Sequence, residues 1–422
     1  MSFDELKLSE ADIEIIDGDR GVNYPKQNEF YDIGYCLFLN AKNVTKDGFD
    51  FNEKSFISRE KDNLLRKGKL VRNDIVLTTR GTVGNVAFYN NRVPFNNIRI
   101  NSGMVILRAK QSEYLPEFVY WMFRSNYIQD QINALKTGSA QPQLPITIMR
   151  TIKVLKPKLC EQKVIAATLS ALDDMIELNN QINKTLEEMA QAIFKSWFVD
   201  FEPFRDGEFE ESEIGLIPKG WKIVELEEIC SIQNGFAFKS SDYQDTGCRL
   251  IRTTNITSNG YVNNNDIKFL PQSFYESEKY KNYRFECFDT VLVMVGASIG
   301  KIGLITEYNL PSLQNQNMWR FRANNREISS VYIHYVVRRV NEFVSNWATG
   351  SARDFYRKES FQRAKCVLPP KNVMKEFRLL TDSLFIQISS NIMENALLLE
   401  IRDILLPKLM SGEIRVPVEE VV

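Results

Sequence analysis

Apolar residues recur at heptad spacing in two stretches of this chain, residues 165–197 and 377–409. In the first stretch the two rows are Ile165, Leu172, Asn179, Leu186, Ile193 and Leu169, Ile176, Asn183, Ala190, Trp197. In the second they are Phe377, Leu384, Asn391, Leu398, Leu405 and Thr381, Ile388, Asn395, Arg402, Leu409. Heptad spacing over this length is typical of coiled-coil helices. We therefore expect two long helices, the first of about 35 residues or roughly 52 Å, and Pro407 is expected to end the second.

Two asparagines interrupt each apolar seam, Asn179 and Asn183 in the first helix and Asn391 and Asn395 in the second. A buried amide lowers the stability of a helix pair but fixes its register, because slippage would leave the amide unpaired. If the two helices pair antiparallel, their midpoints meet and the asparagines face each other. These four residues are predicted to set the register.

The sequence also contains an internal duplication. Asn43-Val44-Thr45-Lys46-Asp47-Gly48-Phe49 returns as Asn255-Ile256-Thr257-Ser258-Asn259-Gly260-Tyr261, so position 43 moves to 255, a shift of 212. Thr137-Gly138-Ser139-Ala140 returns as Thr349-Gly350-Ser351-Ala352 with the same shift. A period this long indicates two duplicated globular units, each large enough to bury its own core.

Each copy opens with a region of mixed character and then turns into one of the helices. Short β-rich runs at residues 74–79 and 289–294 end in glycine-rich bends, and helices are expected near residues 115–135 and 330–347. The fold class is α+β. The expected boundaries are globular regions 1–157 and 221–370, helices within 158–202 and 371–422, and a linker at 203–220.

Composition narrows the classes of function. The chain is 44% hydrophobic and 25% charged, with no apolar run long enough to cross a membrane and no export signal at Met1-Ser2-Phe3-Asp4-Glu5. Its six cysteines lack CxxC spacing, and His334 is the only histidine, which argues against a zinc site and against Ser-His-Asp chemistry. We expect a cytoplasmic protein without metal or cofactor.

The charge is unevenly distributed. Residues 1–157 hold 22 Lys and Arg against 18 Asp and Glu, a net charge of +4, and residues 221–370 hold 19 against 15, again +4. Residues 158–220 hold 6 against 13, a net −7, and residues 371–422 hold 6 against 8, a net −2. Basic globular regions suit a polyanion such as nucleic acid, and acidic connectors suit a different partner, although scattered surface charge explains the bias equally well.

One glycine-rich bend, Gly296-Ala297-Ser298-Ile299-Gly300-Lys301, approaches the phosphate-binding loop of nucleotide-hydrolysing enzymes. It is one residue too short, and Ile302 replaces the Ser or Thr that would hold magnesium. No Asn/Asp-Pro-Pro-Tyr/Phe motif of an adenine methyltransferase is present either. The residues carry no catalytic motif.

Several motifs together resemble the specificity subunits of type I restriction-modification systems, a family of host-defence proteins, over the whole length of the chain. They are Ile16-Asp17-Gly18-Asp19-Arg20-Gly21-Val22-Asn23-Tyr24-Pro25-Lys26, Gly81-Thr82-Val83-Gly84, Thr137-Gly138-Ser139, Pro157-Lys158-Leu159-Cys160-Glu161-Gln162, Glu213-Ile214-Gly215-Leu216-Ile217-Pro218-Lys219-Gly220-Trp221, Gly235-Phe236-Ala237-Phe238 and the bend at Gly296. The first globular region lacks the Gly-Trp entry of the second, and no Glu-Gln pair opens the second helix.

The resemblance implies two target recognition domains joined by an antiparallel helix pair with pseudo-twofold symmetry. It implies a non-catalytic subunit that binds double-stranded DNA and assembles with two adenine-methylating subunits and with motor-nuclease subunits. Each domain would read half of a bipartite target, and the helices would set the spacer. The alternative is a duplicated coiled-coil scaffold that binds proteins only.

Polar and basic residues near the glycine-rich bends and the Thr-Gly-Ser-Ala repeats are the candidate DNA contacts. Gln can bind adenine and Arg can bind guanine through paired hydrogen bonds, and Lys or Arg can bind phosphate. The candidates are Lys26, Lys42, Arg80, Thr82, Gln141, Gln143, Lys239, Arg252, Ser298, Lys301, Arg353, Tyr356, Arg357 and Lys358.

Overall fold

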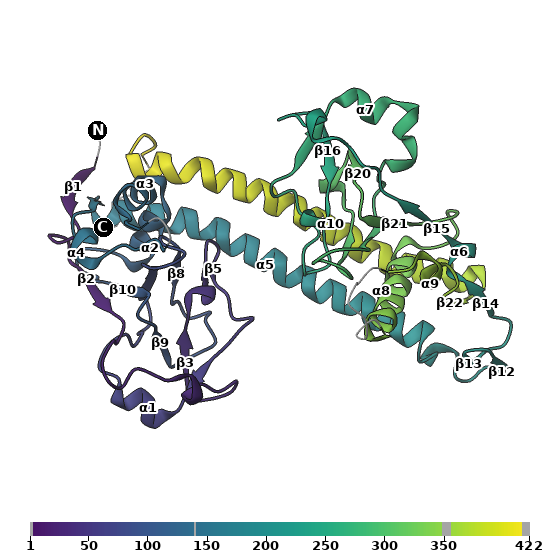
Figure 1. Cartoon of the computed structure of the whole chain (residues 1–422), viewed down its shortest axis with the longest axis horizontal. Helices are drawn as coiled ribbons and strands as arrows, with labels where there is room; N and C mark the ends of the chain where they lie inside the picture. Colours follow the sequence, from purple (N-terminus) through teal and green to yellow (C-terminus); the bar gives the residue numbers. More distant parts are fainter. Residues whose placement is uncertain (1–2, 139–140, 348–355, 416–422) are drawn as a thin grey trace. The chain divides into compact units, whose positions relative to one another are not determined.

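The computed structural model describes residues 3–138, 141–347 and 356–415 and divides into two compact units (Figure 1). Unit 1 comprises Met1–Ile176 with Leu397–Val422, and unit 2 comprises Glu177–Ala396. Each unit therefore combines one globular α+β region with part of each long helix.

Unit 1 contains three sheets and one hairpin. The four-stranded antiparallel sheet has the order β2-β10-β7-β8, the three-stranded sheet β6-β3-β9 pairs β3 with β9 in parallel, and β1 pairs with β11. The strands are β1 (Asp4–Lys7), β2 (Ile13–Asp17), β3 (Cys36–Leu39), β4 (Val44–Thr45), β5 (Gly48–Phe49), β6 (Phe56–Ile57), β7 (Ile75–Thr78), β8 (Val86–Phe88), β9 (Ile98–Ile100), β10 (Met104–Ala109) and β11 (Lys153–Lys156). The helices are η1 (Gln27–Glu29), η2 (Ala41–Asn43), α1 (Arg59–Leu64), α2 (Pro116–Arg124), α3 (Asn126–Leu135) and α4 (Ile146–Met149).

Unit 2 repeats these sheets. The four-stranded order is β15-β21-β18-β19, the three-stranded order is β17-β16-β20 with β16 and β20 parallel, and β14 pairs with β22. The strands are β12 (Phe209–Ser212), β13 (Gly215–Pro218), β14 (Lys222–Glu225), β15 (Cys230–Asn234), β16 (Cys248–Ile251), β17 (Lys268–Leu270), β18 (Thr290–Val293), β19 (Ile302–Leu304), β20 (Ser312–Gln314), β21 (Met318–Ala323) and β22 (Lys365–Leu368). The helices are η3 (Glu202–Phe204), α6 (Leu226–Ile229), η4 (Ser240–Asp242), η5 (Thr253–Asn255), α7 (Gln272–Glu276), η6 (Glu278–Tyr283), η7 (Glu307–Asn309), α8 (Ser330–Trp347) and α9 (Lys358–Gln362).

The duplication predicted from the sequence is thus a duplication of sheet topology, and the α+β class is confirmed. The middle strands β7 and β18 are buried throughout, as expected for continuous runs of Ile, Val, Leu and Thr in the interior of a sheet. In unit 1 the helix expected over residues 115–135 is two helices. The backbone of Ser125 is extended there, and its buried hydroxyl donates to the Met122 carbonyl at 2.6 Å.

Each unit has its own core. In unit 1, α2 and α3 cover the four-stranded sheet with buried aromatic residues such as Phe118 and Trp121, and the last turns of the second long helix add Leu406 and Met410. In unit 2, Phe194 and Phe198 of the first long helix pack among buried residues of α8 and β21. The long helices are therefore part of both cores.

The long helices are α5 (Leu159–Phe198, 40 residues) and α10 (Lys371–Ser411, 41 residues). In unit 1 Arg402 of α10 donates to Asp173 of α5, with Nη1 2.8 Å from Oδ1. Within unit 2 Asn179 of α5 donates to Asn395 of α10, and Asn391 of α10 donates to Asn183 of α5. As the residue number on α5 increases, the residue number of its partner on α10 decreases. The helices are therefore antiparallel, as predicted.

Pro407 does not end the second helix, which corrects the expectation from the sequence. It lies inside α10, which continues to Ser411. Proline removes one helical N–H donor, but at this position only one turn remains. The helix ends instead at Gly412, which has a positive φ of 73°, and the amide of Ile414 then donates to the Lys408 carbonyl at 3.2 Å.

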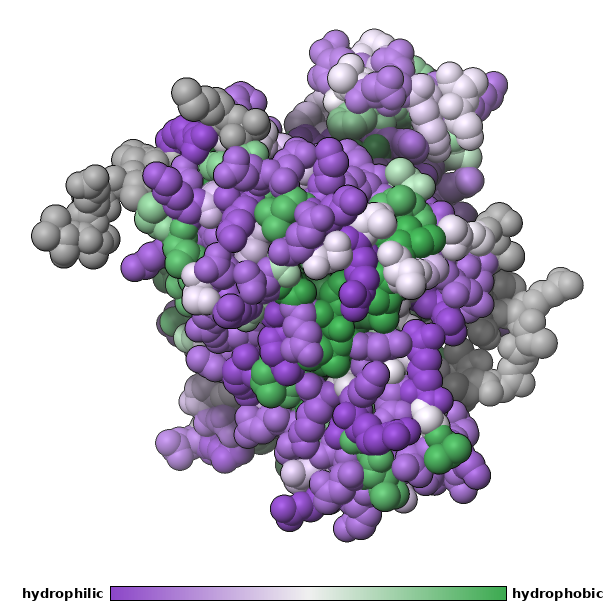
Figure 2. All heavy atoms as spheres, turned by 90° about the vertical axis from the view of Figure 1, so that its left-hand side faces the viewer, coloured by the Kyte–Doolittle hydropathy of each residue, from purple (hydrophilic) through white to green (hydrophobic). Residues whose placement is uncertain are grey.

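The surface is mainly hydrophilic, with apolar side chains gathered near the middle of the face in Figure 2. Among the described residues, no helix is both long and apolar enough to span a membrane.

Candidate nucleic-acid interface and helix register

Unit 1 brings four of the candidate DNA contacts together from segments 60 residues apart. The loop between β7 and β8 holds Arg80 and Thr82, and the segment before α4 holds Gln141 and Gln143. Backbone hydrogen bonds join the two segments, from the Gly81 amide to the Pro142 carbonyl (3.1 Å) and from the Leu144 amide to the Thr79 carbonyl (2.8 Å). The guanidinium of Arg80 donates to Gln143 Oε1 at 3.4 Å.

The polar groups of this loop face solvent. Arg80, Thr82 and Gln141 are exposed, and Gln143 is half-buried. Arg80 forms no ion pair among the described residues. Gly81 has a φ of 76°, which strains any residue with a side chain, and a Cβ there would meet open space. The loop can therefore approach another molecule closely and present to it the charge of Arg80, which no ion pair in the described residues neutralises.

Unit 2 builds the corresponding loop between β18 and β19. Gly296, which occupies the place of Gly81, has a φ of 92° and also faces open space. Lys301 is exposed, and its amide donates to the carbonyl of the half-buried Ser298 at 3.1 Å. The amide of Tyr356 donates to the Met294 carbonyl at 3.1 Å, so a distant segment again lies against the loop.

The candidates beyond this loop differ in accessibility. Tyr356 is 9% exposed and packs on Phe361 with ring centroids 5.6 Å apart, so its side chain supports the loop from within. Arg357 is exposed just before α9, and Lys358 is the first, half-buried residue of that helix. Arg353 and the repeat at 349–352 lie outside the described residues, as do Ser139 and Ala140 of the first repeat.

The other four candidate cations lie on or immediately before short helices beside the three-stranded sheets. Lys26 and Lys239 immediately precede η1 and η4, and both are exposed. Lys42 of η2 pairs with Glu53 at 2.7 Å. Arg252, half-buried before η5, donates to the Asp266 carbonyl at 2.8 Å. No hydrogen bond or ion pair in the described ranges connects these four with the glycine loops.

The asparagines of the helix seam meet as predicted, all within unit 2. The Asn179 amide donates to Asn395 Oδ1 at 3.0 Å, and the Asn391 amide donates to Asn183 Oδ1 at 2.8 Å. All four side chains are buried, between 4% and 8% exposed. A shift of the helices by one turn would leave these amides without partners.

Sequence reasoning missed a close backbone approach next to each loop. Gly18 follows β2 and Gly235 follows β15. A Cβ at Gly18 would lie 2.3 Å from the Asn101 carbonyl oxygen, and one at Gly235 would lie 1.7 Å from the Asn315 carbonyl oxygen. Only glycine fits at either position. Comparing the two copies residue by residue, with allowance for small length differences, could have revealed this pair.

A duplicated ion pair was missed as well. Arg108 at the end of β10 donates to both oxygens of Asp74 at 2.8 Å, and Arg322 at the end of β21 donates to both oxygens of Asp289 at 2.7 and 2.6 Å. Asp74 and Asp289 are almost fully buried. The repeated Asp before each central β-run was the available signal.

No group of three or more His, Cys, Asp or Glu in the described part of the chain is placed to hold a metal ion. The repeated glycine loops present the exposed cations Arg80 and Lys301, which suit contact with a polyanion.

Comparisons with known proteins identify the family. The sequence profile of the type I restriction modification DNA specificity domain matches residues 14–188 and 218–377. The specificity subunit of the type I restriction enzyme MjaIX from Methanocaldococcus jannaschii is 25% identical over 86% of this chain and 84% of its own length. The HindI specificity subunit from Haemophilus influenzae is 23% identical over 94% and 98%. The fold is similar to the crystal structure of the type I restriction-modification S subunit from M. genitalium, with a TM-score of 0.61, 15% identity and coverage of 97% and 96%.

These relatives favour a DNA-specificity subunit over a coiled-coil scaffold without DNA specificity. The chain therefore belongs to the family of type I restriction-modification DNA specificity subunits, which are non-catalytic, as its motifs predicted.

Proposed function

We propose that this chain reads a bipartite DNA target, with the β7–β8 loop of unit 1 contacting one half-site and the β18–β19 loop of unit 2 contacting the other. The observation that carries the proposal is the repeated loop. In both units a glycine with positive φ, Gly81 or Gly296, faces open space on a loop that also carries an exposed cation, Arg80 or Lys301.

The residues on these loops offer both kinds of DNA contact. An exposed Arg or Lys binds phosphate, or a guanine edge in the major groove, and Gln binds adenine through two hydrogen bonds. The hydrogen bond between Arg80 and Gln143 holds the two side chains next to each other, so they would contact adjacent groups on DNA.

The helices are the proposed docking surface for two methylating subunits, to which motor-nuclease subunits would be added. Leu178 and Ile182 of α5 are 55% and 38% exposed, and Leu379 and Ile386 of α10 are 70% and 59% exposed. Apolar side chains exposed along a helix of this length are usual for surfaces that bind another protein. The surplus of acidic residues between 158 and 220 would select basic partners.

Salt-dependent binding to duplex DNA tests the role of the loops. Arg80→Ala and Lys301→Ala are each expected to weaken binding by about 1–3 kcal/mol if they read a base, or to reduce the salt slope by about one if they bind phosphate. Lys184→Ala is the matched control, because Lys184 is an exposed cation on α5 whose weak contact with Glu188 spans 3.9 Å. Equal effects of all three substitutions would contradict the proposal.

Sequencing of methylated adenines in cells that carry this chain and its methylating subunits tests the bipartite target directly. The expected result is one motif with two specific halves and a spacer of fixed length. Methylation independent of this chain, together with complexes that form without DNA, would support the scaffold instead.

A further inference from the structure

The repeat Asn43–Phe49 and Asn255–Tyr261 contains none of the residues proposed above to contact DNA. In each unit this segment lies beside an ion pair between an arginine of the globular region and a carboxylate of α5. The contacts of both arginines assign them a role in holding each recognition domain on the spacer helix.

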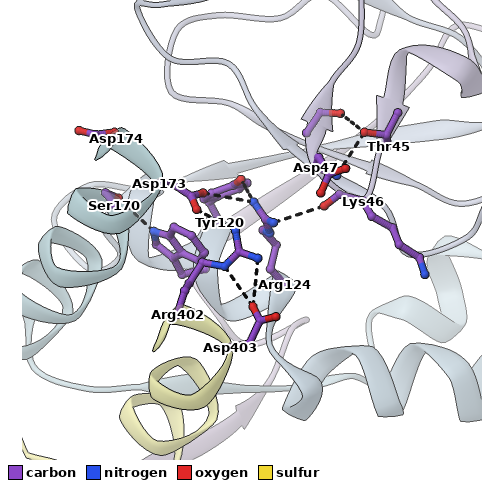
Figure 3. A network of polar contacts seen from close by, with 12 residues as sticks. Thr45, Lys46, Asp47, Tyr120, Arg124, Ser170, Asp173, Asp174, Arg402 and Asp403 are labelled. Carbon is purple, nitrogen blue, oxygen red and sulfur yellow. Dashed lines mark hydrogen bonds and ion pairs between the residues drawn. The ribbon is translucent and has the colours of Figure 1, made fainter. Parts of the chain in front are cut away.

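In unit 1 the arginine is Arg124, at the end of α2. Its guanidinium is 3.6 Å from Asp173 of α5, and it donates to the Lys46 carbonyl in the β4–β5 turn at 3.3 Å. It also donates to the hydroxyl of Tyr120. Figure 3 shows Arg124 reaching towards Lys46 on one side and Asp173 on the other. One side chain thus joins three elements: α2, the β4–β5 turn and the long helix.

Two further contacts make this attachment rigid. Trp121, one turn before Arg124, donates its ring N–H to Ser170, one turn before Asp173, at 3.0 Å. Arg402 of α10 donates to the second oxygen of Asp173 at 2.8 Å (Figure 3). Asp173 is therefore shared by α2 and both long helices, and two attachment points one turn apart resist rotation better than one.

In unit 2 the arginine is Arg338 of α8. The equivalent strands β10 and β21 begin at Met104 and Met318, so equivalent residues here differ by 214 in residue number. By this shift Arg338 corresponds to Arg124, and Tyr335 corresponds to Trp121. Arg338 donates to Glu187 of α5 with Nη1 2.6 Å from Oε1, and the Tyr335 hydroxyl donates to the Glu187 carbonyl at 3.2 Å.

The repeated turn takes part here too. Tyr261, at the end of the second copy of the turn, donates its hydroxyl to Glu187 Oε2 at 3.3 Å. Each arginine also lies over the ring of the aromatic residue one turn before it, with Arg124 5.2 Å from Trp121 and Arg338 5.8 Å from Tyr335. Arginine is suited to this position because its planar group stacks on a ring and donates in several directions at once.

Burial makes these contacts specific. The side chains of Arg124 and Asp173 are 12% and 29% exposed, and those of Arg338 and Glu187 are 31% and 22% exposed. Charged hydrogen bonds in partly buried surroundings are directional and stronger than those in water. Neither arginine lies on a glycine loop. Their effect on DNA recognition would therefore be exerted through the orientation of the domain, not through a base.

We propose that Arg124 and Arg338 are positioning residues that fix the angle of each recognition domain on α5, and so restrict the target to one spacer length. The proposal rests on the bipartite function proposed above. If the angle loosens, each half-site is still read, but targets whose halves are one base pair closer or farther apart become acceptable.

The test uses the complete chain with its methylating subunits and compares Arg338→Gln with Arg339→Gln by sequencing methylated adenines. Arg339 is the matched control, since it is the neighbouring exposed arginine on α8. The expected result for Arg338→Gln is unchanged half-sites, with discrimination against spacers one base pair shorter or longer reduced at least tenfold. Glu187→Gln provides a second variant that keeps an oxygen for Tyr261, and Arg338→Glu with Glu187→Arg should restore the wild-type spacer by re-forming the ion pair.

Three results would overturn the proposal. They are a single wild-type spacer in folded Arg338→Gln and Glu187→Gln, altered half-site bases, or equal relaxation by Arg339→Gln. Less methylation with an unchanged spacer would show a merely structural role for the arginine. If the wild-type complex itself methylates no bipartite motif, the proposed function fails, and that result is distinct from the three above.

Discussion

At the scale of single residues, each globular region contains a buried carboxylate, Asp74 or Asp289, that pairs with an arginine at the start of the central strand. Asp74 accepts hydrogen bonds from Arg108 and from the Val71 amide, the latter at 2.8 Å. Asp289 accepts the same set from Arg322 and the Glu286 amide, the latter at 2.7 Å. Each carboxylate closes a turn before the central strand and pairs with an arginine of the neighbouring strand. This double role explains why both copies have Asp at this position.

Asp74→Ala is expected to reduce the free energy of unfolding by about 3 kcal/mol, the lower end of the range for breaking a buried pair. The lower end applies because Arg108 is 34% exposed and can recover part of its hydration. Urea denaturation measures the loss. Lys42→Ala, which breaks the exposed Lys42–Glu53 pair, should show no measurable change. A similar loss in both variants would contradict this account.

The sequence predicted which residues lie on the loops, but not how side chains such as Tyr356 pack behind them. Arg80 and Gln143 were predictable as loop residues because glycine-rich bends and repeated motifs are typical of surface loops, and their contact with DNA stays a prediction. The role of Tyr356 was not predictable, because its burial depends on Phe361 and on the close approach of Gly300, where a Cβ would lie 2.8 Å from the tyrosine hydroxyl. Such packing arises from contacts distant in the chain, which no local pattern encodes.

At the scale of elements, the asparagine pairs join α5 to α10, and we expect them to define the alignment of the two helices. The Asn391 amide donates to Asn183, and its own oxygen accepts from Gln387 at 2.7 Å. Removing one partner leaves a buried donor unsatisfied, whereas replacing both partners by apolar residues leaves none.

Asn183→Leu alone is therefore expected to lower the free energy of unfolding by about 1–3 kcal/mol. Combined with Asn391→Leu, it should recover most of that loss, since Leu packs well on an apolar seam. A double-mutant cycle in urea measures the coupling between the two sites. Additive losses would show that the two amides act independently.

Heptad spacing predicted both helices, because periodicity reports which face of a helix is buried, and the family resemblance implied their antiparallel pairing. The spacing predicted the ends of the helices less well. Pro407 does not stop α10, since Leu406, Leu409 and Met410 on either side of it are buried in the core of unit 1. Burial of these three side chains outweighs the loss of one hydrogen bond.

At the scale of the whole molecule, the duplication predicts that residues 1–201 can act as a half-protein. This fragment lacks Leu406, Leu409 and Met410, which complete the core of unit 1. The shift of 212 places Phe194, Trp197 and Phe198 of a second copy at the corresponding positions. We expect a homodimer that methylates a palindromic target together with the methylating subunits.

The dimer should be less stable than the complete chain, because Phe and Trp are larger than the Leu and Met they replace and overpack the site. Light scattering gives the oligomeric state, and thermal denaturation gives the stability. A strict monomer, even with methylating subunits present, would argue against interchangeable halves.

The last prediction is that the length of the two helices sets the length of the spacer between the half-sites. Insertion of four residues between Glu188 and Met189 would lengthen α5 by about 6 Å, or one to two base pairs. The structure makes this a poor site, because Glu187 on one side and Ala190 on the other both lie in unit 2 and contact its globular region. A cleaner design adds one heptad after Ile176 in α5 and another after Ala396 in α10, where the two units divide.

Matched insertions keep the antiparallel partners aligned on both sides, and seven residues preserve the face of each helix to within about 20°. The helices lengthen by about 10.5 Å, which corresponds to about three base pairs at 3.4 Å each. The expected target has unchanged half-sites and a spacer longer by about three base pairs, as read from methylated adenines. Binding should also weaken, because three base pairs turn the groove by roughly 100° and the DNA must twist or bend to follow. The control is the heptad in α5 alone, which cannot keep both the Asp173–Arg402 pair of unit 1 and the asparagine pairs of unit 2 aligned and should abolish methylation. An unchanged spacer in the matched variant would mean that the helices do not measure the target.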